Sequence, residues 1–304
     1  MMPRAVKCLA LVLSLATGLA GCALPGPLGE PVEKTFRSTP GGDEQKYVVM
    51  LPDGFDAGRQ YDILIVLHGH GSDRWQYVRA QRGECKGARD VAARYGLIYV
   101  SADYRGKTSW MGPAAEADVV RLIGLLRKEY RVRHLLLAGA SMGGTSSLIF
   151  AALHPGLVDG VVSQNGTANM MEYDKFQGAI SASYGGDKTQ KPEEYRKRSP
   201  ERTPERFTMP IALCVGGKDT TVPPDSVRRL YARLRELGRK DLLLIDRPDG
   251  GHSSSYEDTV AALEFAIHAV RARGAHESEK HTDGKPDEPG EADGPEDDGA
   301  QPAP

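Results

Sequence analysis

Residues 135–144 are Leu-Leu-Leu-Ala-Gly-Ala-Ser-Met-Gly-Gly, and this stretch decides the fold. The leading apolar residues predict a buried β-strand, and the helix-like stretch after Gly144 places the serine in a tight turn between strand and helix. Such a turn strains the serine backbone, and side chains at positions 139 and 143 would collide with the neighbouring strand and helix. The G-x-S-x-G pattern in this setting is typical of a nucleophilic serine. We therefore expect Ser141 to be a nucleophile.

Two later segments supply an acid and a base in the chain order that serine hydrolases of this kind use. The apolar run 211–215 predicts a strand that leads into Asp219, and the run 242–245 predicts another that leads into His252. A helical pattern between the two runs provides the crossover that parallel strands need. Active sites of open parallel sheets gather on loops just past strand ends. The sequence therefore predicts a catalytic triad of Ser141, His252 and Asp219.

The oxyanion hole is expected from two backbone N–H groups. Residues 63–67 form a continuous apolar run that leads into His-Gly-His-Gly-Ser. In such hydrolases, the loop after this strand gives one donor and the residue after the nucleophile gives the other. We assign the donors to His70 and Met142, with Gly71 as the alternative to His70. The imidazoles of His68 and His70 are expected to form hydrogen bonds that structure the loop.

A wider resemblance rests on further segments, namely His68-Gly69, Asp103-Tyr104-Arg105-Gly106, Tyr195-Arg196-Lys197-Arg198-Ser199-Pro200, Gly217-Lys218-Asp219 and Gly251-His252. With these and the Ser141 turn, the chain resembles an α/β-hydrolase of the prolyl oligopeptidase and dienelactone hydrolase branch. That branch also includes feruloyl esterase-like and polyhydroxybutyrate depolymerase-like enzymes. The resemblance covers about residues 45–272. It implies an α/β fold with a mostly parallel sheet of the eight-stranded type and helices on both faces.

The resemblance also implies acyl transfer to water through an acyl-enzyme, with no cofactor and no metal. No segment of the size of the β-propeller that restricts oligopeptidases to short peptides precedes the expected hydrolase domain. We therefore expect a carboxylic-ester hydrolase that acts on small or carbohydrate-linked esters, such as acetyl or feruloyl esters. A serine peptidase of the prolyl oligopeptidase type, acting on short peptides, is the alternative. A catalytically inactive binding protein on the same scaffold is the third possibility.

Residues 167–207 are rich in polar and charged residues and lie between two predicted strands, so they are expected to form a small cap over the site. Substrate-pocket residues are expected in this cap and in the loop after residue 103. Core packing is the competing explanation for the same side chains. The candidates are Tyr104, Trp110, Met170, Met171, Tyr173, Phe176 and Tyr184.

The N-terminal end predicts export and anchoring. Two basic residues precede an apolar run at residues 8–20, which is too short for a stable membrane span. The run closes with Leu-Ala-Gly-Cys, which resembles a bacterial lipobox. That resemblance implies a lipoprotein signal peptide at residues 1–21 and a lipidated Cys22 that holds the protein on a membrane of the bacterial cell envelope. An ordinary secretion signal is the alternative.

The rest of the chain divides by composition. Residues 22–44 include a Pro- and Gly-rich stretch and predict a flexible tether, 45–273 the hydrolase domain, and 274–304 a disordered acidic tail. The formal net charge of −2 gives no sign of a nucleic-acid partner. Cys85 and Cys214 could form a disulfide in an exported chain, or remain free thiols that pack as small apolar groups.

Overall fold

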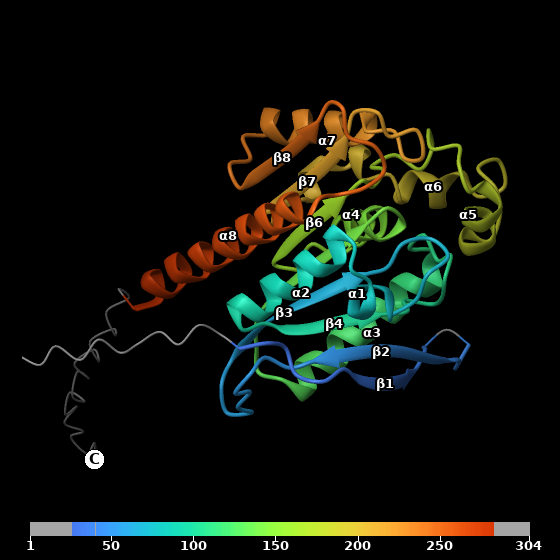
Figure 1. Ribbon diagram of the computed structural model, residues 1–304. Coiled ribbons are helices and arrows are strands. Elements are labelled where there is room, and N and C mark those ends of the chain that lie inside the picture. The colour runs from blue at the N-terminus through green and yellow to red at the C-terminus, as the bar shows by residue number, and fades with distance from the viewer. Residues whose placement is uncertain (1–25, 40, 283–304) are drawn as a thin grey trace, which may run out of the picture.

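A computed structural model describes residues 26–39 and 41–282, which build one eight-stranded sheet between layers of helices (Figure 1). The strands are β1 (Val32–Arg37), β2 (Glu44–Met50), β3 (Tyr61–Leu67), β4 (Ile98–Ala102), β5 (Val132–Ala140), β6 (Gly160–Gln164), β7 (Ile211–Gly216) and β8 (Leu242–Arg247). Their spatial order is β1-β2-β4-β3-β5-β6-β7-β8. β3 to β8 pair in parallel, whereas β1 and β2 pair antiparallel at one edge. The prediction of a mostly parallel eight-stranded sheet is confirmed.

Helices cover both faces of this sheet, as the sequence predicts. They are α1 (Gln76–Arg79), α2 (Gly83–Tyr95), α3 (Pro113–Glu129), α4 (Met142–Leu153), α5 (Gln177–Tyr184), α6 (Pro192–Lys197), α7 (Asp225–Glu236) and α8 (Tyr256–Thr282), with 3₁₀ turns η1 (Pro200–Arg202) and η2 (Pro204–Arg206). Buried residues of α3, α4 and α7 join one core cluster, and those of α2 and α8 join another. None of the helices in the described ranges carries an apolar stretch long enough to cross a membrane.

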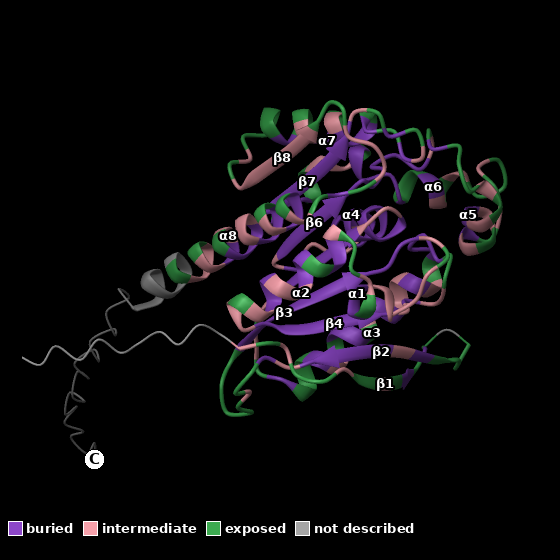
Figure 2. Ribbon diagram, viewed as in Figure 1, coloured by how far each residue is buried: buried purple, intermediate pink, exposed green. Residues whose placement is uncertain are grey.

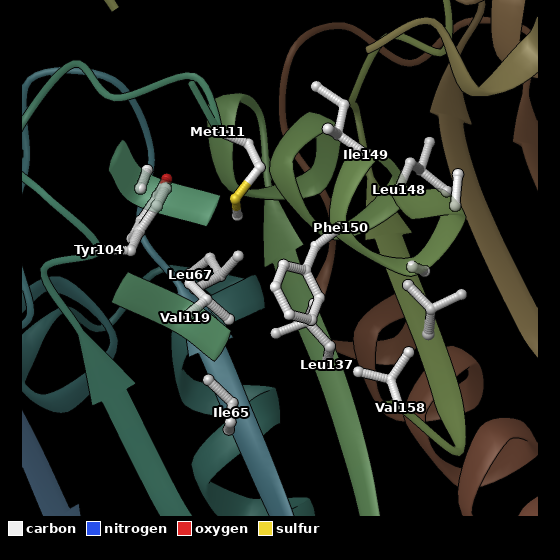
Figure 3. Close-up of a cluster of buried hydrophobic side chains, with 14 of the residues drawn as sticks. Ile65, Leu67, Tyr104, Met111, Val119, Leu137, Leu148, Ile149, Phe150 and Val158 are labelled. Atoms are coloured by element: carbon white, nitrogen blue, oxygen red, sulfur yellow. The ribbon is translucent and has the colours of Figure 1, made fainter. Parts of the chain in front are cut away.

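The central strand β3 lies between the two clusters and is buried along its whole length (Figure 2). Successive side chains of a strand point to opposite faces. Ile65 and Leu67 accordingly pack in the cluster that includes Phe150 of α4 (Figure 3), and Leu64 and Val66 pack in the cluster under α2 and α8. A strand covered on both faces needs a continuous apolar sequence. This is why the run 63–67 has no polar alternation.

The prediction of a flexible tether at residues 22–44 is wrong for β1, which lies within this range. Val32–Arg37 pairs antiparallel with β2, with Val32 opposite Val49 and Arg37 opposite Glu44. Most side chains of this edge strand are exposed, but Phe36 is buried in the core cluster of the α3 face. Main-chain pairing and one buried aromatic ring therefore fix a segment whose composition indicates a flexible linker.

The C-terminal end of the folded domain also differs from the prediction by composition. α8 continues to Thr282, beyond the expected end of the folded domain at residue 273. The predicted signal peptide at residues 1–21, the lipidation site Cys22 and residues 283–304 of the predicted acidic tail lie outside the described residues.

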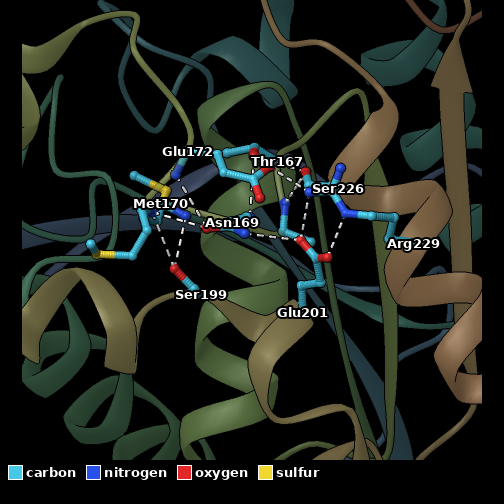
Figure 4. Close-up of polar contacts among 10 residues, drawn as sticks. Thr167, Asn169, Met170, Glu172, Ser199, Glu201, Ser226 and Arg229 are labelled. Atoms are coloured by element: carbon cyan, nitrogen blue, oxygen red, sulfur yellow. Dashed lines mark hydrogen bonds and ion pairs between the residues drawn. The ribbon is translucent and has the colours of Figure 1, made fainter.

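Residues 167–207 contain α5, α6, η1 and η2 and lie to the right of the sheet in Figure 1. A polar network ties this segment to α7 (Figure 4). Glu201 accepts from Asn169 Nδ2 at 3.0 Å and from Arg229 Nε at 2.5 Å, while the Oγ atoms of Thr167 and Ser226 lie 3.1 Å apart. Buried polar groups that are mutually satisfied specify one arrangement. The segment is therefore held firmly against the domain.

The two cysteines of the domain are free. Cys85 of α2 and Cys214 of β7 are both buried in the cluster under α2 and α8. Of the two possibilities left open by the sequence, the structure has the unpaired thiols.

Candidate active site

The serine turn is formed where β5 meets α4. Ser141 has φ 59° and ψ −123°, an uncommon backbone conformation for a residue with a side chain. Its N–H donates to the carbonyl of Gln164 at 2.9 Å. A Cβ atom at Gly143 would lie 2.0 Å from the carbonyl oxygen of Leu67, and one at Gly139 would lie 2.5 Å from the backbone of Gly143. The expected collisions with the neighbouring strand and helix are confirmed, so both positions require glycine.

The structure brings Ser141, His252 and Asp219 together. His252 Nε2 lies 2.9 Å from Ser141 Oγ, and His252 Nδ1 lies 2.6 Å from Asp219 Oδ2. The other Asp219 oxygen accepts the N–H groups of Thr221 and Val222, each at 2.9 Å. A carboxylate can only accept, so His252 carries its proton on Nδ1 and offers the Nε2 lone pair to the serine hydroxyl. This is the arrangement in which an imidazole can take the serine proton.

Loops at the carboxyl ends of three different strands supply these groups. Ser141 follows β5, Asp219 follows β7, and His252 lies between β8 and α8. The Asp219 side chain is only 1% exposed, whereas the His252 side chain is 26% exposed. The acid is thus shielded from water while the imidazole faces the solvent side where a substrate would enter.

The expected oxyanion donors can be separated by their hydrogen bonds. The N–H of Gly71 donates to the carbonyl of Lys107 at 2.7 Å, so it is engaged by the loop that follows β4. In the described part of the chain, the N–H groups of His70 and Met142 have no acceptor. Met142 is the first residue of α4, where helix N–H groups lack intrahelical partners. The geometry therefore favours His70 over the alternative Gly71.

The two histidine side chains of this loop form hydrogen bonds, as expected. His68 is buried, with its ring nitrogens 2.8 Å from the Gly69 carbonyl and 3.2 Å from that of Asp103. His70 Nδ1 accepts from Trp110 Nε1 at 3.0 Å. Burial lowers the pKa values of both histidines.

A cavity of about 310 Å³ opens beside Ser141 and His252. Of the predicted pocket residues, Phe176 is the one that lines it. Phe176 is 38% exposed, and its ring lies tilted against that of His70 with a centroid distance of 4.4 Å. Residues 167–207 therefore contribute one lining residue to this cavity, the exposed Phe176.

The predictions of Tyr104, Trp110 and Met170 as pocket residues need correction. All three are almost completely buried, and none of them lines the cavity. The Tyr104 hydroxyl donates a hydrogen bond to the His68 carbonyl at 2.7 Å, and the Trp110 indole N–H donates one to His70 Nδ1 at 3.0 Å. Trp110 and Tyr104 thus support the oxyanion loop, and Met170 packs in the core.

Sequence reasoning missed several lining residues. Arg82 and Glu84 enter the cavity from the start of α2, with Arg82 Nε 3.3 Å from Glu84 Oε1. Nothing in their local sequence distinguishes them from a solvated helix start. Asn165 also lines the cavity, and its place directly after β6 is a signal that could have identified it.

Comparisons with known proteins agree with this architecture. The chain matches the prolyl oligopeptidase family over residues 87–269, more than half of its length. No curated protein matches it.

Solved structures match with a probability of 1.00. Acylaminoacyl peptidase of Pyrococcus horikoshii is 17% identical, with a TM-score of 0.63 over 81% of this chain and 42% of that one. A puromycin-hydrolysing peptidase of Mycobacterium tuberculosis is also 17% identical, with a TM-score of 0.64 over 80% and 39%. Dipeptidyl peptidase 4 of Porphyromonas gingivalis is 13% identical, with a TM-score of 0.62 over 80% and 36%. The chain spans less than half the length of each.

Proposed function

The chain belongs to the prolyl oligopeptidase family and has an α/β-hydrolase fold, and from this premise we propose that it is a serine peptidase acting on short peptides. The observation that carries the proposal is the continuous hydrogen-bonded line from Asp219 through His252 to Ser141, at 2.6 Å and 2.9 Å. Such a line activates a serine hydroxyl that is otherwise a weak nucleophile.

The proposed reaction follows from these contacts. Ser141 Oγ attacks the acyl carbonyl while His252 Nε2 takes its proton and then delivers it to the leaving amine. Asp219 holds the imidazole and stabilises the imidazolium that forms. The N–H groups of His70 and Met142 bind the oxyanion, where one such donor is worth about 3–4 kcal/mol. Water then cleaves the acyl-enzyme by the same steps in reverse.

The family and the names of the similar structures support a peptidase rather than the carboxylic-ester hydrolase favoured by the sequence. Those structures are described as an acylaminoacyl peptidase, a puromycin-hydrolysing peptidase and a dipeptidyl peptidase. An acyl-enzyme mechanism also accepts esters, so the two functions share one site and differ in the leaving group. The third possibility, an inactive binding protein, is disfavoured by the close contacts among all three triad side chains.

A direct comparison of amide and ester substrates tests the proposal. The purified protein is assayed on aminoacyl, N-acyl-aminoacyl and dipeptidyl p-nitroanilides, beside p-nitrophenyl esters from acetate to decanoate. Ser141→Ala is the control for both series. We expect anilide turnover that Ser141→Ala abolishes. Ester turnover without anilide turnover would make the protein an esterase, and the lack of both would make it a binding protein.

We extend the proposal to the location of the enzyme. The lipobox-like sequence before Cys22 supports attachment of acyl chains to this cysteine and anchoring on the bacterial cell envelope. Labelled palmitate fed to expressing cells is expected to enter the wild type and not Cys22→Ala. The same variant should move from the membrane fraction to the soluble fraction. Labelling of both proteins alike would exclude Cys22 as the anchor.

A further inference from the structure

The triad mechanism gives no role to the buried side chain of Asn165, which lines the cavity. Asn165 follows β6 directly, so it lies between the strand that leads to Ser141 and the strand that leads to Asp219. It is only 5% exposed and has a φ of 48°, in the left-handed region. Its N–H donates to the carbonyl of Cys214 in β7 at 2.8 Å. A buried residue keeps this uncommon backbone conformation only when its surroundings hold it there. Such a conformation is therefore a reason to look for a function of the side chain.

The side-chain amide of Asn165 forms two hydrogen bonds with residues 251–254, the His252 loop. Its Nδ2 donates to the carbonyl of Gly251 at 3.1 Å, and its Oδ1 accepts from Ser254 Oγ at 2.7 Å. Gly251 immediately precedes His252, and Ser254 follows it by two positions. The amide therefore binds the loop on both sides of the imidazole.

The loop needs such support because it has little of its own. Within residues 251–254, the backbone hydrogen bond is a short turn from the Ser253 N–H to the Gly251 carbonyl at 3.0 Å. His252 must satisfy two distances at once, one to Ser141 and one to Asp219. A displacement of about 1 Å in such a constellation costs on the order of a hundredfold in rate.

We propose that Asn165 is the positioning residue that fixes the His252 loop, and so the imidazole, between Ser141 and Asp219. This inference rests on the proposed function of the triad. Asn165 acts through the Gly251 carbonyl and the Ser254 hydroxyl, without contacting the reacting atoms.

Asparagine is the residue that this position demands. Among residues with side chains, asparagine is one of the few that tolerates the left-handed region readily. Its amide also offers a donor and an acceptor side by side, as the two partners require. Aspartate keeps the acceptor for Ser254 but places negative charge against the Gly251 carbonyl. Glycine keeps the backbone conformation and loses both contacts.

These differences define the test. Asn165→Gly, Asn165→Asp and Ser254→Ala are compared with the wild type in the full chain. The rate constant for phosphonylation of Ser141 by a fluorophosphonate reports serine activation without requiring a known substrate. We expect this rate to fall about 10- to 100-fold in both Asn165 variants and by a smaller factor in Ser254→Ala, which keeps one of the two contacts. With a turned-over substrate, kcat should fall with KM little changed.

Asn169→Gly is the matched control. Asn169 is 6% exposed and lies four positions after Asn165 in the chain. Its side chain forms hydrogen bonds with Glu201 and the Met171 N–H instead of the His252 loop. We expect it to lose thermal stability as Asn165→Gly does while it keeps the wild-type phosphonylation rate. An equal fall in rate for both glycine variants would reduce Asn165 to a general structural role.

The outcomes separate this inference from the proposed function. If wild-type Ser141 does not react with the fluorophosphonate, the proposed function fails and the inference with it. If the wild type reacts and Asn165→Gly reacts equally fast in folded form, only the inference is overturned. Should Asn165→Gly fail to fold, an unchanged rate in folded Ser254→Ala and Asn165→Asp would overturn it as well.

Discussion

The indole N–H of Trp110 donates a hydrogen bond to Nδ1 of His70 at 3.0 Å. Because an indole nitrogen can only donate, His70 Nδ1 must be unprotonated, and the neutral ring carries its proton on Nε2. Trp110 is fully buried, and His70 is the residue to which the first oxyanion donor is assigned. A buried tryptophan therefore fixes the tautomer of the neutral ring and the orientation of a side chain at the edge of the site.

The first prediction is that Trp110→Phe raises the pKa of His70. Burial lowers this pKa, and the Trp110 hydrogen bond, which favours the neutral ring, acts in the same direction. A phenylalanine removes the donor and keeps an aromatic ring against Phe176. A ¹⁵N NMR titration of His70 should show the Nε2–H tautomer in the wild type and a higher pKa in the variant.

The same shift predicts a pH dependence of stability. A histidine with a lowered pKa in the folded state contributes its full stability above the unfolded pKa of about 6.5 and loses it as the pH falls below that value. The free energy of unfolding should therefore decline on acidification less steeply in Trp110→Phe than in the wild type. Parallel declines would contradict this role for Trp110.

Asp219→Asn should leave the fold intact and remove most of the activity. An amide oxygen can still accept the N–H groups of Thr221 and Val222, but the variant no longer favours the Nδ1–H tautomer or the imidazolium of His252. We expect kcat to fall about 10⁴-fold. Steady-state kinetics on the best anilide substrate measures the loss. A fall of less than tenfold would mean that another group orients His252.

Gly143→Ala should prevent the correct fold of the serine turn, because the new Cβ would lie 2.0 Å from the main-chain oxygen of Leu67. Backbone atoms cannot move aside as a flexible side chain can, so we expect a loss of about 3 kcal/mol or more. Gly124→Ala is the matched control, since Gly124 lies exposed in α3 with no atom near its Cβ position. That change should stabilise by up to about 1 kcal/mol. Urea unfolding of Gly143→Ala, Gly124→Ala and the wild type measures both changes in the free energy of unfolding.

Asp62 predicts sensitivity to acid. Burial raises its pKa, but hydrogen bonds and charge from Arg133 and Arg271, each at 2.7 Å, outweigh this and leave the pKa below its ordinary value. The ion pairs of Asp62 with the two arginines contribute their full stability above the unfolded pKa of Asp62, about 3.9. This stability is lost as the pH falls through the folded pKa of Asp62. Asp62→Asn should cost about 3 kcal/mol at neutral pH, the low end for a buried pair because both guanidinium groups remain partly in solvent.

Urea unfolding at neutral and at acidic pH tests this prediction. The wild type should lose more stability than Asp62→Asn between the two conditions. An equal loss in both proteins would show that other carboxylates set the acid limit.

The buried thiols should be inert while the chain is folded. Burial raises the pKa values of Cys85 and Cys214 to about 12, so the reactive thiolate is scarce near neutral pH. In a variant with alanine at positions 8 and 22, a thiol reagent such as DTNB should react with neither cysteine before denaturation and with both after it. Fast reaction of the native protein would indicate an opening near α2 or β7, where the two thiols lie.

The serine turn and the order of its partners could be predicted because the evidence for each is local. Gly139, Ser141 and Gly143 form a pattern within five consecutive residues, and Asp219 and His252 each follow a continuous apolar run. A buried parallel strand must be apolar throughout, so its end marks the active edge of the sheet wherever it occurs. By itself, the sequence determined the buried parallel strands that lead to the site and the three candidate catalytic residues, but not the edge strand β1.

Only the tertiary structure decided which side chains meet between these loops. Phe36 makes an edge strand of a segment whose composition indicates a linker, and Phe176 lines the cavity while Trp110 lies behind it. Asn165 grips a loop 86 positions away in the chain. Such contacts depend on how separate strands and their loops are packed, and no local pattern in the sequence records which residues that packing brings together.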